Sequence, residues 1–311
     1  MKLSTAIDDY VRLKRAMGQR FISGGRTLKG FCRHCGDVNA DAVTAECVQV
    51  FLRSKRKPGR FRHIAYYAVA GFFRFAMARG YVASSPAPAH VRARDTAFTP
   101  FIYTADQVRR IIQAVYELDH QPCQIDPDTF RALILLLYGT GLRVGEALHL
   151  TLRDVNLDER LLLIRDSKFF KTRWVPMGDD VKAVLSAQFE RRRRRTAAAD
   201  APLFATRRGV PIRHGTLLYR FARARVHAGV TRNADSLYQP RIHDLRHSFA
   251  VGRVISWYRE GADLQVMLPR LATYLGHVEL KDTQRYLTLT PTMLHEASLR
   301  FERYAWGERH E

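Results

Sequence analysis

Two arginines, two histidines, a tyrosine and a glutamate occur in an order that could support chemistry on a phosphodiester: Arg143, Glu146, His243, Arg246, His277 and Tyr286. A phenol oxygen can attack phosphorus, forming a covalent bond to the enzyme. Arginine can hold the charge that develops on the phosphoryl oxygens without giving up a proton. The spacing of these side chains therefore predicts a nucleophilic tyrosine with a cationic site for the phosphate.

The first arginine follows a Gly139-Thr140-Gly141 sequence that predicts a tight turn between two helices. We expect Arg143 in the first turn of the second helix, close to backbone N–H groups that favour an anion. Glu146 follows at i+3, on the same helical face, where its carboxylate can orient the guanidinium. Taken alone, this spacing would equally fit an ordinary ion pair on the surface.

His243 and Arg246 are also three residues apart on an expected helix, so their side chains can reach one point. His243 could accept the proton of the attacking phenol. Tyr286, nine residues after His277, is the predicted nucleophile, with Tyr274 and Tyr304 as weaker alternatives.

Together these residues resemble the tyrosine recombinases, the phage integrase family. The resemblance implies cleavage of one strand of double-stranded DNA to leave a 3′-phosphotyrosyl bond and a free 5′ hydroxyl. It also implies a homo-tetramer on paired DNA sites, and catalysis without a metal or another cofactor. A lysine in a β-hairpin protonates the leaving oxygen in this family. Lys168 matches its position best, and Lys171 would then contact the DNA backbone.

The sequence predicts a mainly α-helical fold with a small β-sheet, in two domains. Residues 1–90 are expected to form a helical, DNA-binding domain of the core-binding kind, and residues 91–100 a linker after a proline-rich stretch. Residues 101–311 would form an α+β catalytic domain, with strands at 161–164 and 173–175. A capping box at Thr104 and Gln107 predicts its first helix.

The charge of the chain predicts a polyanionic partner. The formal net charge is +21, and residues 1–95 alone carry 18 basic and 6 acidic side chains. A basic run at Lys55, Arg56 and Lys57 is a candidate DNA contact, although a solvated helix end explains it almost as well.

Other classes of protein fit less well. No apolar stretch approaches the roughly 20 residues of a membrane span, and no signal-peptide region is present, so we expect a cytoplasmic protein. Cys32 and Cys35 have zinc-ligand spacing, but they continue an apolar helical stripe and are expected in a core. A type IB topoisomerase-like enzyme and a non-cutting DNA-binding regulator of the same fold remain open as alternatives.

Overall fold

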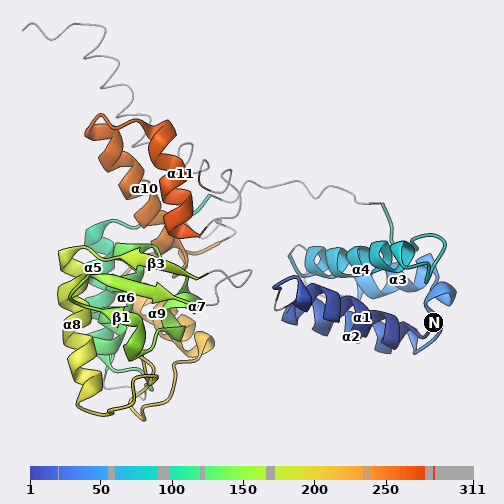
Figure 1. The fold of residues 1–311 in the computed structure, drawn as a ribbon, viewed down its shortest axis with the longest axis horizontal. Coiled ribbons are helices and arrows are strands. Elements are labelled where there is room, and N and C mark those ends of the chain that lie inside the picture. Colours follow the sequence, from blue (N-terminus) through green and yellow to red (C-terminus); the bar gives the residue numbers. More distant parts are fainter. Residues whose placement is uncertain are drawn as a thin grey trace, which may run out of the picture. The chain divides into compact units, whose positions relative to one another are not determined.

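The computed structural model describes residues 1–19, 21–54, 60–89, 99–119, 123–165, 172–233, 236, 238–276 and 283, with only the backbone of 60–62. The chain divides into two compact units at residues 98 and 99 (Figure 1). Each unit has a hydrophobic core of its own. The predicted fold class, mainly helical with a small sheet, is confirmed.

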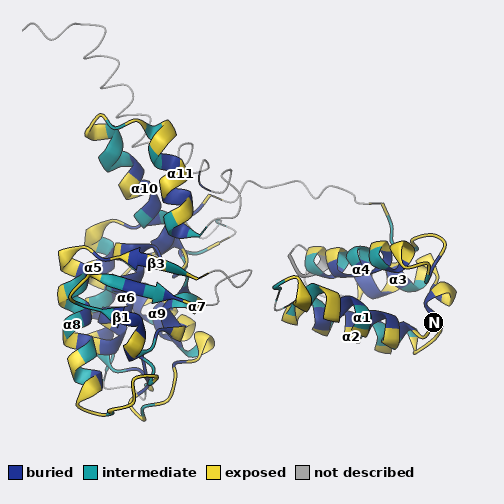
Figure 2. Ribbon diagram, viewed as in Figure 1, coloured by how far each residue is buried: buried dark blue, intermediate teal, exposed yellow. Residues whose placement is uncertain are grey.

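The N-terminal unit is a bundle of α1 (Leu3–Ala16), α2 (Ile22–Cys35), α3 (Ala45–Arg53) and α4 (Arg60–Ala78), with a short η1 (Ala40–Ala42). Buried residues of these helices form one core, and Figure 2 shows both buried and exposed positions along each helix. Thr44 accepts a hydrogen bond from the backbone of Cys47 and so caps α3. Cys32 and Cys35 pack against this core, as the helical stripe predicts.

The helices of the second unit carry most of its core. They are α5 (Ala105–Glu117), α6 (Pro127–Thr140), α7 (Val144–His149), η2 (Leu152–Asp154), α8 (Asp179–Arg193), α9 (His214–His227), α10 (Asp244–Arg259) and α11 (Leu264–Leu275). The predicted capping box on α5 is present, with Thr104 and Gln107 exchanging hydrogen bonds. Helix α6 is buried along most of its length and contacts α5, α8 and α10.

A small antiparallel sheet follows η2 in the order β1 (Val155–Asn156), β2 (Leu161–Ile164) and β3 (Arg173–Pro176). The two predicted strands are β2 and β3, and they pair with Leu162 opposite Val175 and Ile164 opposite Arg173. Alternation along β3 buries Val175 and turns Trp174 outward. Arg173 therefore shares the inward face of the strand with Val175.

Helices α10 and α11 lie side by side, and a small apolar cluster between them fixes the end of α11 (Figure 1). Leu275, the last residue of α11, is 1% exposed. Gly276 then ends the helix in the left-handed conformation, with φ at 67°. No helix within the described ranges is long and apolar enough to cross a membrane.

Candidate active site: three arginines at one helix end

Arg143 lies at the boundary between the Gly139–Gly141 turn and α7. Helix α7 begins only at Val144, so Arg143 is its N-cap residue. It does not lie in the first turn of the helix, which is the position that the sequence predicts. Its backbone N–H and its Nη1 donate to Glu146 Oε2 and Oε1 at 3.0 and 2.9 Å. Its Nη2 donates to the carbonyl oxygen of Gly276 at 2.8 Å. The expected contact with Glu146 is present, and it fixes the guanidinium at the end of α11.

Arg246 reaches the same helix end from α10. It is 2% exposed, and its Nη1 and Nη2 donate to the carbonyl oxygens of Gly141 and Leu275 at 2.8 and 2.7 Å. These bonds tie together the glycine turn before Arg143 and the last turn of α11. Two predicted arginines, 103 residues apart in sequence, thus meet at one place.

A third arginine, Arg173 on β3, was not among the predicted site residues. Its Nη1 and Nη2 donate to the two carboxylate oxygens of Glu146 at 3.1 and 2.9 Å. Its Nε donates to the carbonyl oxygen of Tyr274 at 2.9 Å. The alternation of β3 is a signal that could have found it, because a charged residue on the buried face of a strand requires a partner.

The three arginines bind three consecutive carbonyl groups, those of Tyr274, Leu275 and Gly276. A helix leaves its last carbonyl groups without partners and carries partial negative charge there, so cations at this end are favourable. Gly276 also leaves room for them, because a Cβ there would lie 3.1 Å from Arg173 Nη1 and 3.5 Å from Arg143 Nη1.

Glu146 is the carboxylate that offsets part of this positive charge. Its side chain is only 6% exposed. Burial raises the pKa of Glu146, but the hydrogen bonds and charges of Arg173 and Arg143 outweigh burial and hold that pKa below its usual value. An ionised Glu146 leaves these three arginines with an excess of positive charge, which suits a phosphate.

His243 precedes α10, whose start is held by Asp244 accepting from the backbone and the side chain of Arg241 at 2.9 and 2.8 Å. Desolvation by the surrounding protein, together with the charges of Arg246 and Arg241, lowers the pKa of His243 to about 4. The residue is nevertheless exposed to solvent. Arg143 also contributes to that lowered pKa, so His243 belongs to the same electrostatic environment. At neutral pH the imidazole is uncharged and can accept a proton.

Tyr274, the described alternative to Tyr286, is poorly suited to attack. Its ring stacks on Phe249 with centroids 5.6 Å apart, and its hydroxyl donates to the carbonyl oxygen of Pro176 at 3.4 Å. Burial raises the pKa of Tyr274 to about 12, which disfavours the phenolate.

The other predicted site residues lie outside the described residues: Lys55, Arg56, Lys57, Lys168, Lys171, His277 and Tyr286. Tyr304, the second alternative nucleophile, also lies outside them. In the part of the chain that the structure describes, no three His, Cys, Asp or Glu side chains form a group suited to a metal ion.

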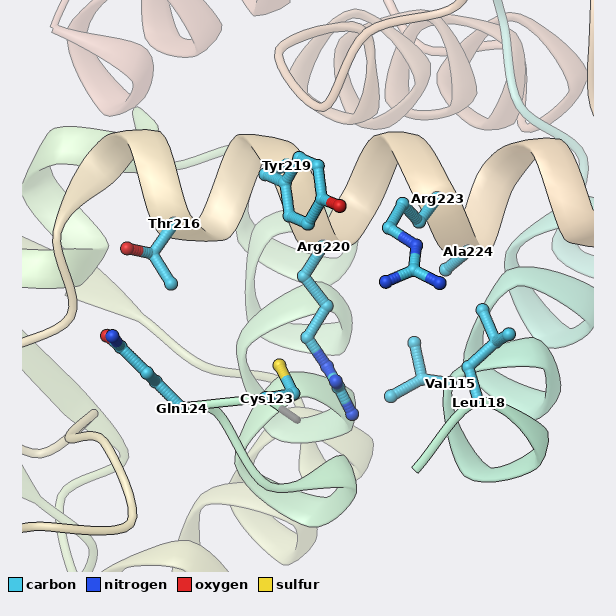
Figure 3. Close-up of a pocket in the computed structure, with 9 residues that line it drawn as sticks. All are labelled: Val115, Leu118, Cys123, Gln124, Thr216, Tyr219, Arg220, Arg223 and Ala224. Atoms are coloured by element: carbon cyan, nitrogen blue, oxygen red, sulfur yellow. The ribbon is translucent and has the colours of Figure 1, made fainter. Parts of the chain in front are cut away.

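A cavity of about 190 Å³ lies away from these arginines, between α5 and α9 (Figure 3). Arg220 points into it from α9, toward Cys123 and Val115, and its guanidinium lies over the ring of Phe130. None of the predicted site residues lines this cavity, so it is separate from the candidate active site.

The sequence model of the phage integrase family matches residues 102–293. The y4rB protein of Sinorhizobium fredii, which bears the name of an integrase/recombinase, is 32% identical over 311 residues, with 98% of each chain covered. Tyrosine recombinase XerC of Pelobacter propionicus is 29% identical and covers 87% of this chain and 85% of its own.

Two solved structures show the same fold. A lambda integrase tetramer bound to a Holliday junction gives a TM-score of 0.64 at 20% identity, covering 92% of this chain and 77% of that one. The integrase of transposon Tn1549 in complex with a circular intermediate DNA gives 0.69 at 16% identity, covering 97% and 99%.

The fold and the family match define a tyrosine recombinase, an enzyme that breaks and rejoins DNA strands. The chain belongs to the phage integrase family.

Proposed function

We propose that this recombinase cleaves double-stranded DNA at specific sites through Tyr286. The phenol oxygen attacks phosphorus, the bond from phosphorus to the 5′ oxygen breaks, and a 3′-phosphotyrosyl bond forms. His243 accepts the phenol proton, and Lys168 gives a proton to the departing 5′ oxygen. A 5′ hydroxyl from a second strand then attacks the phosphotyrosyl bond and releases Tyr286, so the phosphodiester is restored without a cofactor.

One observation supports this proposal above the others: Arg143 and Arg246 reach adjacent carbonyl groups at the end of α11, directly before His277. Two guanidinium groups held at one point can bind both non-bridging oxygens of a phosphate. To the described residues, the Arg143 side chain donates once from Nη1 and once from Nη2, whereas a guanidinium offers about five N–H groups. Donors therefore remain for a phosphate.

DNA is the partner that fits the charge of +21, and two structural relatives are described as bound to DNA. We further propose a homo-tetramer on paired sites, since strand exchange between two duplexes needs four cleavage events, and lambda integrase is described as a tetramer on a Holliday junction. Lys171, Lys55, Arg56 and Lys57 are proposed to contact the backbone of the DNA. The relatives named above come from bacteria, whose DNA lies in the cytoplasm, so we propose that the activity is cytoplasmic.

The test is to incubate the full chain with a library of duplexes and to sequence the covalent protein–DNA junctions. Native protein is expected to give 3′-linked junctions at a defined sequence, and Tyr286→Phe, which lacks only the nucleophilic oxygen, none. A nicked duplex with the recovered sequence then traps the adduct for measurement.

Three outcomes would contradict the proposal. An undiminished adduct with Tyr286→Phe would move the nucleophile to another tyrosine. Adducts that relax supercoils but never join two duplexes would indicate a topoisomerase-like enzyme. Sequence-specific binding without any adduct would indicate a non-cutting regulator.

A further inference from the structure

Arg173 donates to protein from each of the three nitrogens of its guanidinium. Nε donates to Tyr274, while Nη1 and Nη2 donate to Glu146. Its side chain is 14% exposed, half the 28% of Arg143. The guanidinium of Arg173 thus binds acceptors of the protein itself and is poorly placed to bind phosphate.

Glu146 connects Arg173 to Arg143. Oε1 accepts from Arg143 Nη1 at 2.9 Å and from Arg173 Nη1 at 3.1 Å, so the two guanidinium groups share one carboxylate oxygen. Without Arg173, Glu146 would lose two charge-assisted hydrogen bonds while only 6% exposed. A buried carboxylate that loses such partners must move, recruit water or bind a proton, and each change displaces Arg143.

We propose that Arg173 is a positioning residue for DNA cleavage, which holds Glu146 and the end of α11 so that Arg143 meets the scissile phosphate. Arg173 acts through two contacts, one with Glu146 and one with the backbone of Tyr274, and each holds a group that Arg143 binds or a neighbour of that group. The bidentate contact fixes the position of the Glu146 carboxylate, which Arg143 binds. The bond to the Tyr274 carbonyl fixes the backbone at the end of α11, where Arg143 binds the carbonyl of Gly276. This inference rests on the proposed function of Arg143 as a phosphate ligand.

The geometry requires arginine at this position. Its acceptors, the two oxygens of Glu146 and the carbonyl oxygen of Tyr274, lie around a planar fork. A lysine ammonium carries the same charge but has no rigid fork and cannot reproduce this set of directions. Arg173→Lys therefore separates the effect of geometry from the effect of charge.

The experiment measures single-turnover formation of the covalent adduct at saturating concentration of the nicked duplex, with DNA affinity and thermal denaturation measured in parallel. Arg173→Gln and Arg173→Lys are each expected to slow cleavage by about 10- to 100-fold, the effect of a misplacement of about 1 Å. DNA affinity should change by less than about threefold, because Arg173 does not touch the phosphate. Arg160→Gln is the matched control, since it removes an exposed ion pair with Asp179 beside β2.

A second comparison distinguishes positioning from general support of the fold. In an Arg143→Ala background, Arg173→Gln should slow cleavage by less than about threefold more, because the group that it positions is already absent. The same slowing in both backgrounds would overturn the inference, and so would full activity of Arg173→Lys or Arg173→Gln. If native protein forms no adduct on any duplex, the proposed function fails; if native protein is active and Arg173 variants match it, the role of Arg173 alone fails.

Discussion

Arg143 and Arg246 carry the same charge but are held in different ways. Arg246 is buried and donates to two carbonyl groups in different segments. Arg143 is more exposed, and it forms an ion pair with the carboxylate of Glu146. A buried carbonyl that loses its donor costs about 1–3 kcal/mol. The two arginines should therefore contribute similarly to catalysis but differently to stability.

We expect Arg143→Ala and Arg246→Ala each to slow cleavage by about a hundredfold or more, as the loss of a group that stabilises the transition state does. Arg246→Ala should also lower the free energy of unfolding by about 3 kcal/mol, and Arg143→Ala by about 1 kcal/mol. Chemical denaturation and single-turnover cleavage measure the two effects. Equal destabilisation by both changes would contradict this assignment.

His243 and His247 predict how stability depends on pH. Their ring centroids lie 5.3 Å apart, and the pKa of each is lowered to about 4, with desolvation as the largest cause. The charges of Arg246 and Arg241 contribute to both lowered pKa values, and Asp244 opposes them. The unfolded chain binds these protons near pH 6.5, so stability is present above pH 6.5 and is lost as pH falls toward 4.

The double change His243→Gln and His247→Gln should therefore reduce the fall in Tm between pH 6.5 and 4.5. The exposed His214→Gln serves as the control and should follow the native protein. A native-like fall in Tm for the double variant would show that other groups determine acid sensitivity.

At the scale of elements, the site is organised around the end of α11. One arginine reaches it from the residue before α7, one from β3 and one from α10. One helix end thus aligns groups from three parts of the chain. Gly276 allows this because it adopts a positive φ and leaves space beside Arg173. Gly261 also has a positive φ, of 74°, after α10, but nothing lies within 4 Å of its Cβ position.

This pair of glycines allows a matched test. Gly276→Ala and Gly261→Ala should each lose about 1–2 kcal/mol of stability, the cost of a left-handed alanine. Only Gly276→Ala should slow cleavage, by about 10- to 100-fold, because its methyl group would lie 3.1 Å from Arg173 Nη1 and would shift the guanidinium that positions Arg143 through Glu146. Thermal denaturation and trapping on the nicked duplex measure both. Slow cleavage by Gly261→Ala as well would show that helix termination in general, rather than crowding, limits the reaction.

At the scale of the whole molecule, the positive charge is concentrated in residues 1–95. Helix α2 carries Arg26, Lys29 and Arg33 at spacings of three and four, and all three are exposed. Such a stripe can follow a DNA backbone and displace its counterions. A second exposed group, Arg193, Arg194 and Arg195, lies at the end of α8.

We expect the triple change of Arg26, Lys29 and Arg33 to glutamine to flatten the slope of log K against log salt, by about 0.9 for each phosphate that the protein no longer neutralises. The same triple change at Arg193, Arg194 and Arg195 removes equal charge and should leave the slope nearly unchanged. Fluorescence anisotropy over a range of salt concentrations measures both. A slope for the α2 variant equal to that of the native protein would show that the charge of α2 acts only on solubility.

The sequence by itself determined the local features of this protein. Thr104 with Gln107, Arg143 with Glu146, and the strands at 161–164 and 173–175 could be predicted because their partners lie three residues apart or follow a period of two. The family could also be predicted, since its residues recur in a fixed order along the chain.

Only the tertiary structure decided which groups share a site. Arg173 reaches Tyr274 across 101 residues, and Arg143 reaches Gly276 across 133, and neither separation has a periodicity that a sequence could display. The exact place of Arg143, one residue before α7, likewise depends on where the turn ends. Such contacts follow from packing of α10 against α11 and from the pairing of Arg173 on β3 with Glu146 on α7, because burial selects the partners of a charged side chain only once the elements have met.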